Sequence, residues 1–455
     1  MNGEDQEEEG EMEMEIPVIK WTPGTENAEL EAFLKRPAVD AEAERTAREA
    51  LAAIEAEGDA AVARYTERFN RVALSPEGFA VGKDERMAAV READVEFKRA
   101  LAEASGRIAR FARNGMRKDW QIATPKGGVM GEVFTPLQRV GIYVPGGTAP
   151  LVSTVLMTVT LAKVAGVPEI VVCTPCGPDG TVNRDLLCAL EMAGATETYR
   201  IGGIQAIGAM AYGTETIRKV QKIVGPGGPY VAAAKKLVYG TVDIDMVAGP
   251  SEIAILADDT AVPVHAAADL LSQLEHGSGH EKALLVTTQA SLAARVLEEL
   301  GRLMAVSGRA EYIRRAVANR GAMVVTVDTL DTGMELVNRF APEHFEIMTR
   351  EPRLWMQKAR NAGAIFVGGW TPECAGDFVA GPSHVLPTGG TADCFSGLTV
   401  ESFRKRSSVV AFTRADLLDT LPVIEAMGKM EGLDGHARAG RVRFDTSELP
   451  PLPHG

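Results

Sequence analysis

Segments with strand-like and helix-like spacing alternate twice along the chain, and this alternation constrains the fold more than any other feature. In residues 153–246, apolar segments such as Glu169–Cys173 and Glu197–Ile201 are separated by segments of helical spacing such as Asn183–Ala193. A second run begins at residue 252, with expected strands at residues 252–256, 283–287, 323–327, 345–348 and 364–367. Strands that alternate with helices form βαβ units, in which the strands are parallel. We therefore predict an α/β fold with two Rossmann-like parallel-sheet domains.

The rest of the chain has less regular patterns. Residues 27–116 show helical spacing of apolar positions, for example Ala47, Leu51 and Ile54. Residues 131–144 change toward a period of two, which predicts a pair of strands. Residues 399–455 are too few to bury a core of their own, so we expect them to pack on another domain or on a partner subunit.

Composition and charge exclude several classes of protein. A chain of 455 residues exceeds one compact core, and its low aromatic content of 5% suits packed α/β layers. The first sixteen residues hold eight of the acidic residues and no basic one, which predicts a solvated, disordered leader without the marks of a signal or transit peptide. No apolar stretch reaches 18 residues, so we expect no membrane span. An acidic chain without basic clusters is not expected to bind nucleic acid.

Five cysteines without a secretory signal favour a reducing, cytoplasmic setting. The segment Cys173-Thr-Pro-Cys176 has the CxxC form of redox and zinc motifs. It has no second CxxC to pair with and directly follows an apolar strand. We therefore interpret it as two reduced thiols in a loop at the end of a strand.

The adjacent residues Glu343 and His344 are the strongest catalytic candidates. They follow an expected helix at residues 332–340 and a proline, and they precede an expected strand. Junctions of this kind position side chains without deep burial, and a carboxylate beside an imidazole can exchange protons near neutral pH. The adjacency alone is weak evidence, and other segments must supply the remainder of a site.

Two segments offer possible metal ligands. Gln273 and His276 lie three residues apart at the end of an apolar helix, where they could bind one metal ion or serve as a helix cap. Asp377 lies in a glycine-dense loop, and His384, seven residues later, could be a ligand or could bond local backbone.

A third polar pair, Glu431 and His436, lies in the small C-terminal part and is by itself compatible with a surface role. Together, amide, imidazole and carboxylate groups without thiolate suit a borderline divalent cation such as zinc in an open, catalytic site.

Three glycine-rich loops could approach phosphate groups. They lie between an expected strand and an expected helix, where backbone N–H groups can meet a dinucleotide, although tight turns alone would also explain them. The loops are Val144-Pro-Gly-Gly147, Ile201-Gly-Gly203 and Val224-Gly-Pro-Gly-Gly228.

In this order, these segments closely resemble histidinol dehydrogenases, from about Ile19 to Phe444. The shared stretches are Gly141-Ile-Tyr-Val-Pro-Gly-Gly147, Gly202-Gly-Ile-Gln-Ala206, Ala248-Gly-Pro-Ser-Glu252, Leu271-Ser-Gln-Leu-Glu-His-Gly277, Ala341-Pro-Glu-His344, Gly376-Asp377 with His384-Val-Leu-Pro-Thr388, and Glu431-Gly-Leu-Asp-Gly-His436. The resemblance implies oxidation of L-histidinol to L-histidine through an aldehyde, the last step of histidine biosynthesis. It implies two NAD⁺ per reaction, one zinc per site and a domain-swapped homodimer.

The resemblance also implies roles for individual residues. The zinc ligands would be Gln273, His276, Asp377 and His436, with His436 reaching the site from the other subunit. Together with His344, these four would also contact the substrate. Glu343 and His344 match the acid/base residues, Ser251 and Glu431 match substrate contacts, and Tyr143 and Gln205 match dinucleotide contacts. A third dinucleotide contact, usually asparagine, is replaced here by Gly228.

The expected organisation follows from both lines of reasoning. Residues 1–18 would be the leader, residues 19–133 and 249–398 the first α/β domain with the zinc and catalytic loops, residues 134–248 the dinucleotide-binding domain, and residues 399–455 a segment that reaches the partner subunit. Two alternatives stay open: a paralogue that oxidises another small alcohol, such as a sulfonated diol, and a non-catalytic binding protein on the same scaffold.

Overall fold

The computed structural model describes residues 16–36, 40–146 and 151–445, which form two compact units. Unit 1 comprises residues up to 115 together with residues 137–403, and unit 2 comprises residues 116–136 with those from 404 onward. Among the described residues, no helix combines the length and the apolar character that crossing a bilayer requires.

The first sheet of unit 1 has six parallel strands in the order β1-β11-β10-β9-β12-β13. Their bounds are β1 Val18–Lys20, β9 Glu252–Ala257, β10 Lys282–Thr287, β11 Ala322–Thr326, β12 His344–Met348 and β13 Ala364–Val367. Every residue of β9 is buried, as expected for a parallel strand covered on both faces.

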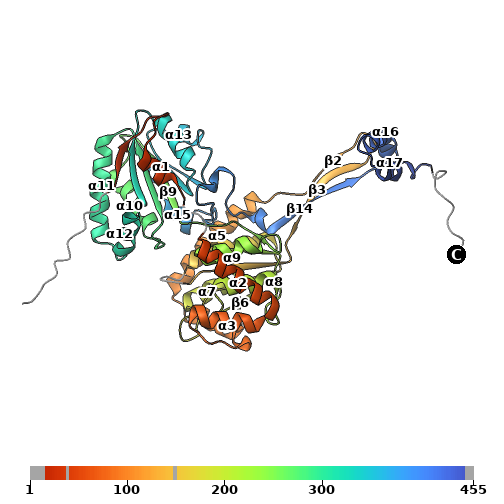
Figure 1. Cartoon of the computed structure of the whole chain (residues 1–455), viewed down its shortest axis with the longest axis horizontal. Coiled ribbons are helices and arrows are strands. Elements are labelled where there is room, and N and C mark those ends of the chain that lie inside the picture. Colours follow the sequence, from red (N-terminus) through yellow and green to blue (C-terminus); the bar gives the residue numbers. More distant parts are fainter. Residues whose placement is uncertain (1–15, 37–39, 147–150, 446–455) are drawn as a thin grey trace, which may run out of the picture. The chain divides into compact units, whose positions relative to one another are not determined.

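Helices cover both faces of the first sheet (Figure 1). Helices α10, α11 and α12 pack on the face of Ile253 and Ile255, whereas α1 and α13 pack on the face of Ala254 and Leu256. The bounds are α1 Ala28–Leu34, α10 Pro263–Leu274, α11 Ala290–Ala305, α12 Ala310–Ala318, α13 Leu330–Phe340, α14 Pro352–Met356 and α15 Glu373–Phe378.

The second sheet of unit 1 has five parallel strands in the order β6-β5-β4-β7-β8. The strands are β4 Arg139–Tyr143, β5 Glu169–Cys173, β6 Glu197–Tyr199, β7 Lys222–Val224 and β8 Asp243–Ile244. The connecting helices are α6 Val152–Ala165, α7 Arg184–Ala193, α8 Gly203–Tyr212 and α9 Pro229–Val238. The predicted α/β class and the two parallel sheets are confirmed.

Four N-terminal helices pack with the second sheet, so the expected assignment of residues 19–133 to the first domain is wrong for most of that range. Helix α2 packs on α8 and α9, α4 on α7, and α5 on α6. Ile54 of α2 approaches α8 at Gly208, where an added Cβ would lie 2.8 Å from the isoleucine side chain. The bounds are α2 Ala41–Glu57, α3 Asp59–Asn70, α4 Lys83–Glu92 and α5 Val95–Gly115.

The expected boundary of the leader is also wrong. Residues 1–15 lie outside the described residues, but Ile16 is buried and β1 extends the first sheet beside β11. Residues 16–18 therefore belong to the folded domain, because β1 continues the parallel ladder and Ile16 joins the core beneath it.

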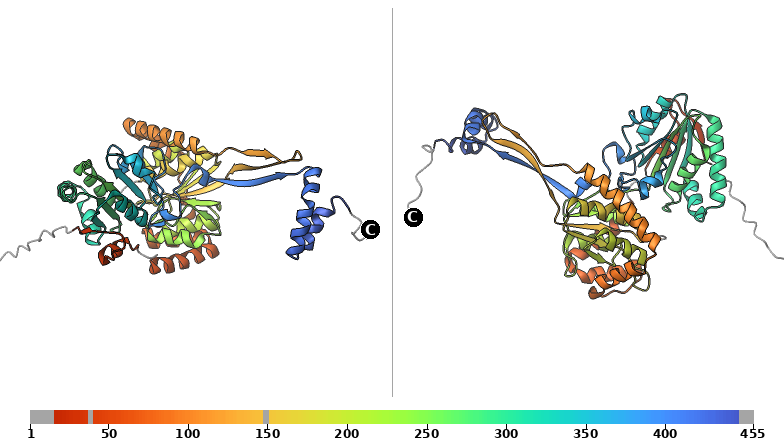
Figure 2. Two further views of the ribbon diagram at one scale, coloured as in Figure 1. Left: turned by 90° about the horizontal axis from the view of Figure 1, so that it is seen from above. Right: turned by 180° about the vertical axis from the view of Figure 1, so that it is seen from behind.

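Unit 2 is an antiparallel sheet followed by two helices (Figure 2). Strands β2 Trp120–Ala123, β3 Val129–Pro136 and β14 Arg404–Ala411 pair in the order β14-β3-β2, and helices α16 Arg414–Met430 and α17 Asp434–Arg441 follow. The predicted strand pair at residues 131–144 is therefore two strands of different sheets, β3 here and β4 in unit 1. The C-terminal residues pair with residues 120–136, which are distant in sequence.

Candidate active site

A cavity of about 550 Å³ in unit 1 is lined by five of the predicted site residues, namely Ser251, His276, Glu343, His344 and Asp377. One wall comes from the amino ends of β9 and β12, and another comes from the loops after β4 and β7, which contribute Gly146 and Pro226. Its polar lining groups include Ser251, His276, Glu343, His344, Glu373, Asp377 and His384.

The position of the cavity follows from chain direction. Helix α10 leaves the carboxyl end of β9 and runs back across the sheet, so it ends near the amino ends of the strands. Gln273 and His276, at the end of α10, therefore meet Glu343 and His344, which open β12. Ligands of open parallel sheets usually bind at carboxyl ends. The second sheet follows this rule, because its loops after β4 and β7 line the cavity. The first sheet instead lines the cavity with the amino ends of its strands.

The backbone around Glu343 and His344 fixes both side chains. Ala341 ends α13 in a left-handed conformation at φ 47°, and Pro342 leads the chain into β12. His344 is paired between Ile253 and Ala364 of the neighbouring strands. Glu343 Oε2 accepts a hydrogen bond from the N–H of Glu252 at 3.1 Å, and it lies 3.9 Å from His344 Nδ1.

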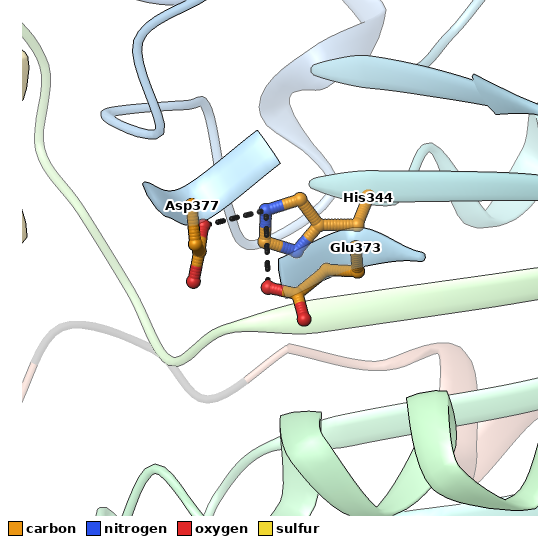
Figure 3. A group of neighbouring side chains, drawn as sticks. All are labelled: His344, Glu373 and Asp377. Atoms are coloured by element: carbon orange, nitrogen blue, oxygen red, sulfur yellow. Dashed lines mark ion pairs between the residues drawn. The ribbon is translucent and has the colours of Figure 1, made fainter. Parts of the chain in front are cut away.

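His344, Glu373 and Asp377 form a compact cluster (Figure 3). His344 Nε2 lies 3.8 Å from Asp377 Oδ1 and 3.9 Å from Glu373 Oε1. Both carboxylates come from α15, where a spacing of four residues places them on one side of the helix. Sequence reasoning missed Glu373, although its spacing from Asp377 is a signal that could have revealed it.

Gln273 connects the two histidines. Its Oε1 lies 2.9 Å from His344 Nδ1, and its Nε2 lies 3.4 Å from His276 Nδ1. The Nδ1 atom of His276 also lies 3.1 Å from the carbonyl of Gln273 and 3.2 Å from that of Ser272. A protonated Nδ1 facing carbonyl groups leaves Nε2 with a free lone pair, which is the tautomer that a metal-binding histidine needs.

Burial shifts the pKa values of these groups strongly. Burial, reinforced by the charges of Asp377, Glu252 and Glu373, raises the pKa of Glu343 well above its usual range. Burial and the neighbouring Glu373 raise the pKa of Asp377 to about 9. Burial lowers the pKa of His344 to about 4, although Glu373 acts in the opposite direction. Poor solvation favours the uncharged form of all three groups, and neighbouring carboxylates add to this effect for Glu343 and Asp377.

These residues fit a divalent cation. Glu373 is buried, and its Oε1 has no hydrogen-bond partner within the described part of the chain. A cation would offset the repulsion among neighbouring carboxylates and would favour the ionised forms of Glu343 and Asp377. Imidazole, amide and carboxylate donors are the ligands that zinc accepts besides thiolate.

His384 lines the same cavity, and its Nδ1 lies 3.1 Å from the carbonyl of Asp377. Its predicted alternative, a bond to local backbone, is therefore present. Cys374 also lines the cavity. The CxxC cysteines, Cys173 and Cys176, are free thiols.

The predicted dinucleotide contacts lie at the carboxyl end of the second sheet. The hydroxyl of Tyr143 accepts a hydrogen bond from the N–H of Gly203 at 3.1 Å. Gln205 is fully buried; its Nε2 donates to Asn70 at 2.6 Å, and its Oε1 has no partner among the described residues. Gly228 precedes α9. None of these three side chains lines the cavity itself, and Gly147 of the first loop lies outside the described residues.

Glu431 and His436 belong to unit 2. Glu431 ends α16, and both residues are exposed. His436 lines a separate cavity of about 590 Å³ in unit 2, together with Phe412 and Phe444.

Comparisons with known proteins agree with this geometry. A family model described as histidinol dehydrogenase matches residues 34–444. The chain is similar to histidinol dehydrogenase from Moorella thermoacetica, with 48% identity over 87% of this chain and 93% of that protein. It is also similar to the Gloeobacter violaceus enzyme, with 43% identity over 94% of this chain and 97% of that protein. The crystal structure of histidinol dehydrogenase from Elizabethkingia anophelis superposes with a TM-score of 0.88 at 34% identity, covering 94% and 98% of the two chains. The chain belongs to the histidinol dehydrogenase family of oxidoreductases.

Proposed function

We propose that the protein is a zinc-requiring, NAD-linked dehydrogenase that converts L-histidinol to L-histidine by way of L-histidinal. The observation that carries this proposal is the convergence of Ser251, His276, His344 and Asp377 on one cavity, with the Gln273 side chain lying between the two histidines. The paralogue alternative is not favoured, because the relatives described above are histidinol dehydrogenases over nearly their full lengths.

His344 acts as the base for the substrate hydroxyl. Its Nδ1 donates to Gln273 Oε1, so Nε2 keeps a lone pair toward the cavity. Burial lowers the pKa of His344 to about 4 and keeps the ring neutral at physiological pH, whereas the neighbouring Glu373 favours the protonated ring and so assists proton acceptance. Because the Nδ1 contact holds the ring, Nε2 is positioned before the substrate arrives.

Glu343 serves the second oxidation, which starts from the hydrate of the aldehyde. Its carboxyl group faces the cavity and is held at Oε2 by the N–H of Glu252. A carboxyl group with a raised pKa is a stronger base once it is ionised, so Glu343 can take the proton of the water that adds to the aldehyde. The two neighbouring residues thereby handle protons in different steps.

Gln273, His276 and Asp377 would hold the zinc together with His436 of the partner subunit. When bound, zinc supplies a Lewis-acidic anchor for the amine and imidazole nitrogens of the substrate. The chain's own groups then exclude water and keep the carbinol carbon beside His344.

NAD⁺ would bind at the carboxyl end of the second sheet, where the N-termini of α8 and α9 lie beside glycine-rich turns. When bound, it supplies the hydride acceptor. Tyr143 and the turn at residues 225–228 border this region, and Pro226 belongs to the cavity wall.

The proposed functional form is a domain-swapped homodimer. Unit 2 leaves large apolar side chains exposed on a small sheet and two helices, which is unusual for a surface that stays in water. They include Trp120, Ile122, Val410, Phe412, Val423, Met427 and Met430. If this surface packs against a second copy, Glu431 and His436, which belong to the same unit, would be brought to that copy as well.

Stoichiometry tests the reaction. Purified protein with L-histidinol and NAD⁺ is expected to form two NADH per histidinol consumed, because alcohol and aldehyde oxidation each release one hydride. A chelator should abolish NADH formation, and added Zn²⁺ should restore it. One NADH per substrate, or turnover of another alcohol only, would overturn the proposal.

Co-expression of two inactive variants tests the shared site. In a swapped dimer, His344→Asn and His436→Ala copies form mixed dimers with one intact site, so the co-expressed sample should regain about a quarter of wild-type activity. Each variant expressed alone is the control. No recovery in mixed dimers that are verified by mass would show that each chain builds its site alone.

A further inference from the structure

A buried ion pair lies behind the turn that follows β7. Lys235 of α9 and Asp245, just after β8, form this pair, with side chains only 2% and 1% exposed. Such burial is costly for both charges unless their remaining hydrogen-bonding capacity is used.

Both side chains form hydrogen bonds with the backbone of one glycine, Gly225. Lys235 Nζ donates to the carbonyl of Gly225 at 2.7 Å, and the N–H of Gly225 donates to Asp245 Oδ2 at 2.7 Å. Asp245 Oδ1 accepts a further hydrogen bond from its neighbour, the N–H of Met246, at 2.6 Å. The pair therefore binds both the carbonyl and the N–H of Gly225.

Gly225 needs this support because the chain leaves the sheet there. It adopts φ +115°, a conformation that favours glycine, and an added Cβ would lie 2.1 Å from the carbonyl oxygen of Tyr143. Strand β7 ends at Val224, so the ladder no longer satisfies the next peptide groups. The pair supplies the hydrogen bonds that the ladder no longer provides, at a point where Gly225 lies close to the backbone of Tyr143.

Stability alone does not account for this arrangement. A buried ion pair contributes little net stability compared with apolar residues of similar size, whereas its fixed geometry is specific. The geometry here is that of the turn Gly225-Pro-Gly-Gly228, whose Pro226 lines the active-site cavity and whose Gly228 starts α9.

We propose that Lys235 and Asp245 are positioning residues that hold the turn at residues 225–228 in its dinucleotide-binding conformation. This inference rests on the proposed function, since it assumes that NAD binds at this turn. The pair touches neither the cavity nor the histidinol-binding groups. Its loss should therefore weaken dinucleotide binding and leave histidinol recognition intact.

The test measures the affinity for NADH by fluorescence titration. Lys235→Met keeps the length of the side chain but removes the donor to Gly225, and we expect the Kd for NADH to rise about tenfold or more. In steady-state assays the KM for NAD⁺ should rise likewise, while the KM for histidinol stays within about twofold. Lys235→Arg keeps the charge and should recover part of the affinity.

The chain provides a matched control. Lys222 and Asp243 form a second lysine–aspartate pair at the amino ends of β7 and β8, with 2.7 Å between Nζ and Oδ2. Lys222→Met should leave the Kd for NADH unchanged, because this pair does not contact the turn.

A double variant keeps the proposal falsifiable if Lys235→Met leaves Asp245 unpaired and the chain unfolds. Lys235→Met with Asp245→Asn removes both charges, and its folding is checked by circular dichroism and thermal unfolding. If the double variant is folded and binds NADH as tightly as wild type, the positioning role is refuted. If wild-type protein itself fails to bind NADH, the proposed function fails instead, so the two failures are distinguishable.

Discussion

Gly228 offers the sharpest test of how local structure governs cofactor binding in this chain. It is the N-cap of α9 with φ −65° and ψ 179°, which any residue can adopt. A Cβ added there meets no atom within 4 Å. Gly228→Asn should therefore be accommodated without strain, and it restores the residue that the family resemblance implies at this position.

The expected magnitude has two parts. Asparagine at an N-cap can accept a hydrogen bond from the first turn of α9, which is worth a few tenths of a kcal/mol over glycine. Replacing glycine also reduces the conformational entropy of the unfolded chain, which stabilises the folded state by about 0.5 kcal/mol. Together they predict about 0.5–1 kcal/mol of added stability. One additional hydrogen bond to the dinucleotide would contribute about 0.5–1.5 kcal/mol, which lowers the Kd for NADH about two- to tenfold.

Thermal unfolding and NADH titration measure the two parts separately. We expect the midpoint of unfolding to rise by about 1–3 °C. Gly227→Asn is the control, because its Cβ would lie 2.4 Å from Cγ1 of Val231 and should destabilise the turn. A lower midpoint for Gly228→Asn would refute the claim that a side chain at this position is accommodated without strain. A higher midpoint with unchanged NADH affinity would refute the cofactor contact and leave only the helix cap.

Three other perturbations test the site and the fold. His344→Asn should lower the rate of both half-reactions about 10²–10⁴-fold, whereas Glu343→Gln should mainly slow oxidation of added histidinal; equal losses in both steps would contradict the division of roles. The pKa of Asp377 is about 9 without metal, so zinc binding must release its proton. The affinity for zinc should therefore rise about tenfold per pH unit from pH 7 toward 9 and flatten above pH 9. Calorimetry in buffers of different ionisation enthalpy would detect that proton, and Asp377→Asn should remove it. Ile54→Ala should lower the free energy of unfolding by about 2–5 kcal/mol in urea titrations, since this fully buried side chain joins α2 to the core of the second sheet.

Local pattern explains which elements were predicted correctly. The strand Glu169–Cys173 has the predicted bounds, because four consecutive apolar residues, Ile170 to Cys173, lie between turn signals. Helix α10 ends at Leu274, as expected for an apolar helix with Gln273 and His276 near its end, because its apolar stripe stops there and Gly277 follows in a left-handed conformation. Such signals depend on neighbours a few residues apart, which the sequence contains.

Membership of a core is not a local property. The alanine-rich stripe of α2 would suit many apolar surfaces, and its packing on α8 and α9, where Ile54 approaches Gly208, assigns it to the second sheet. Likewise, residues 129–136 and 139–143 both have strand patterns, but hydrogen bonds to β14 and to β5 place them in different sheets.

The amino-acid sequence by itself determined the α/β class, most of the strands and helices and the residues able to carry acid/base and metal chemistry. Periodicity, turn residues and side-chain chemistry depend on residues that lie close together in the sequence. Tertiary structure decided which of these groups meet: Gln273 between two histidines, Glu373 beside Asp377, and a lysine–aspartate pair on the peptide groups of Gly225. The physical reason is that burial, and with it each shifted pKa and each satisfied polar group, depends on chain segments that are distant in sequence and are brought together only by packing.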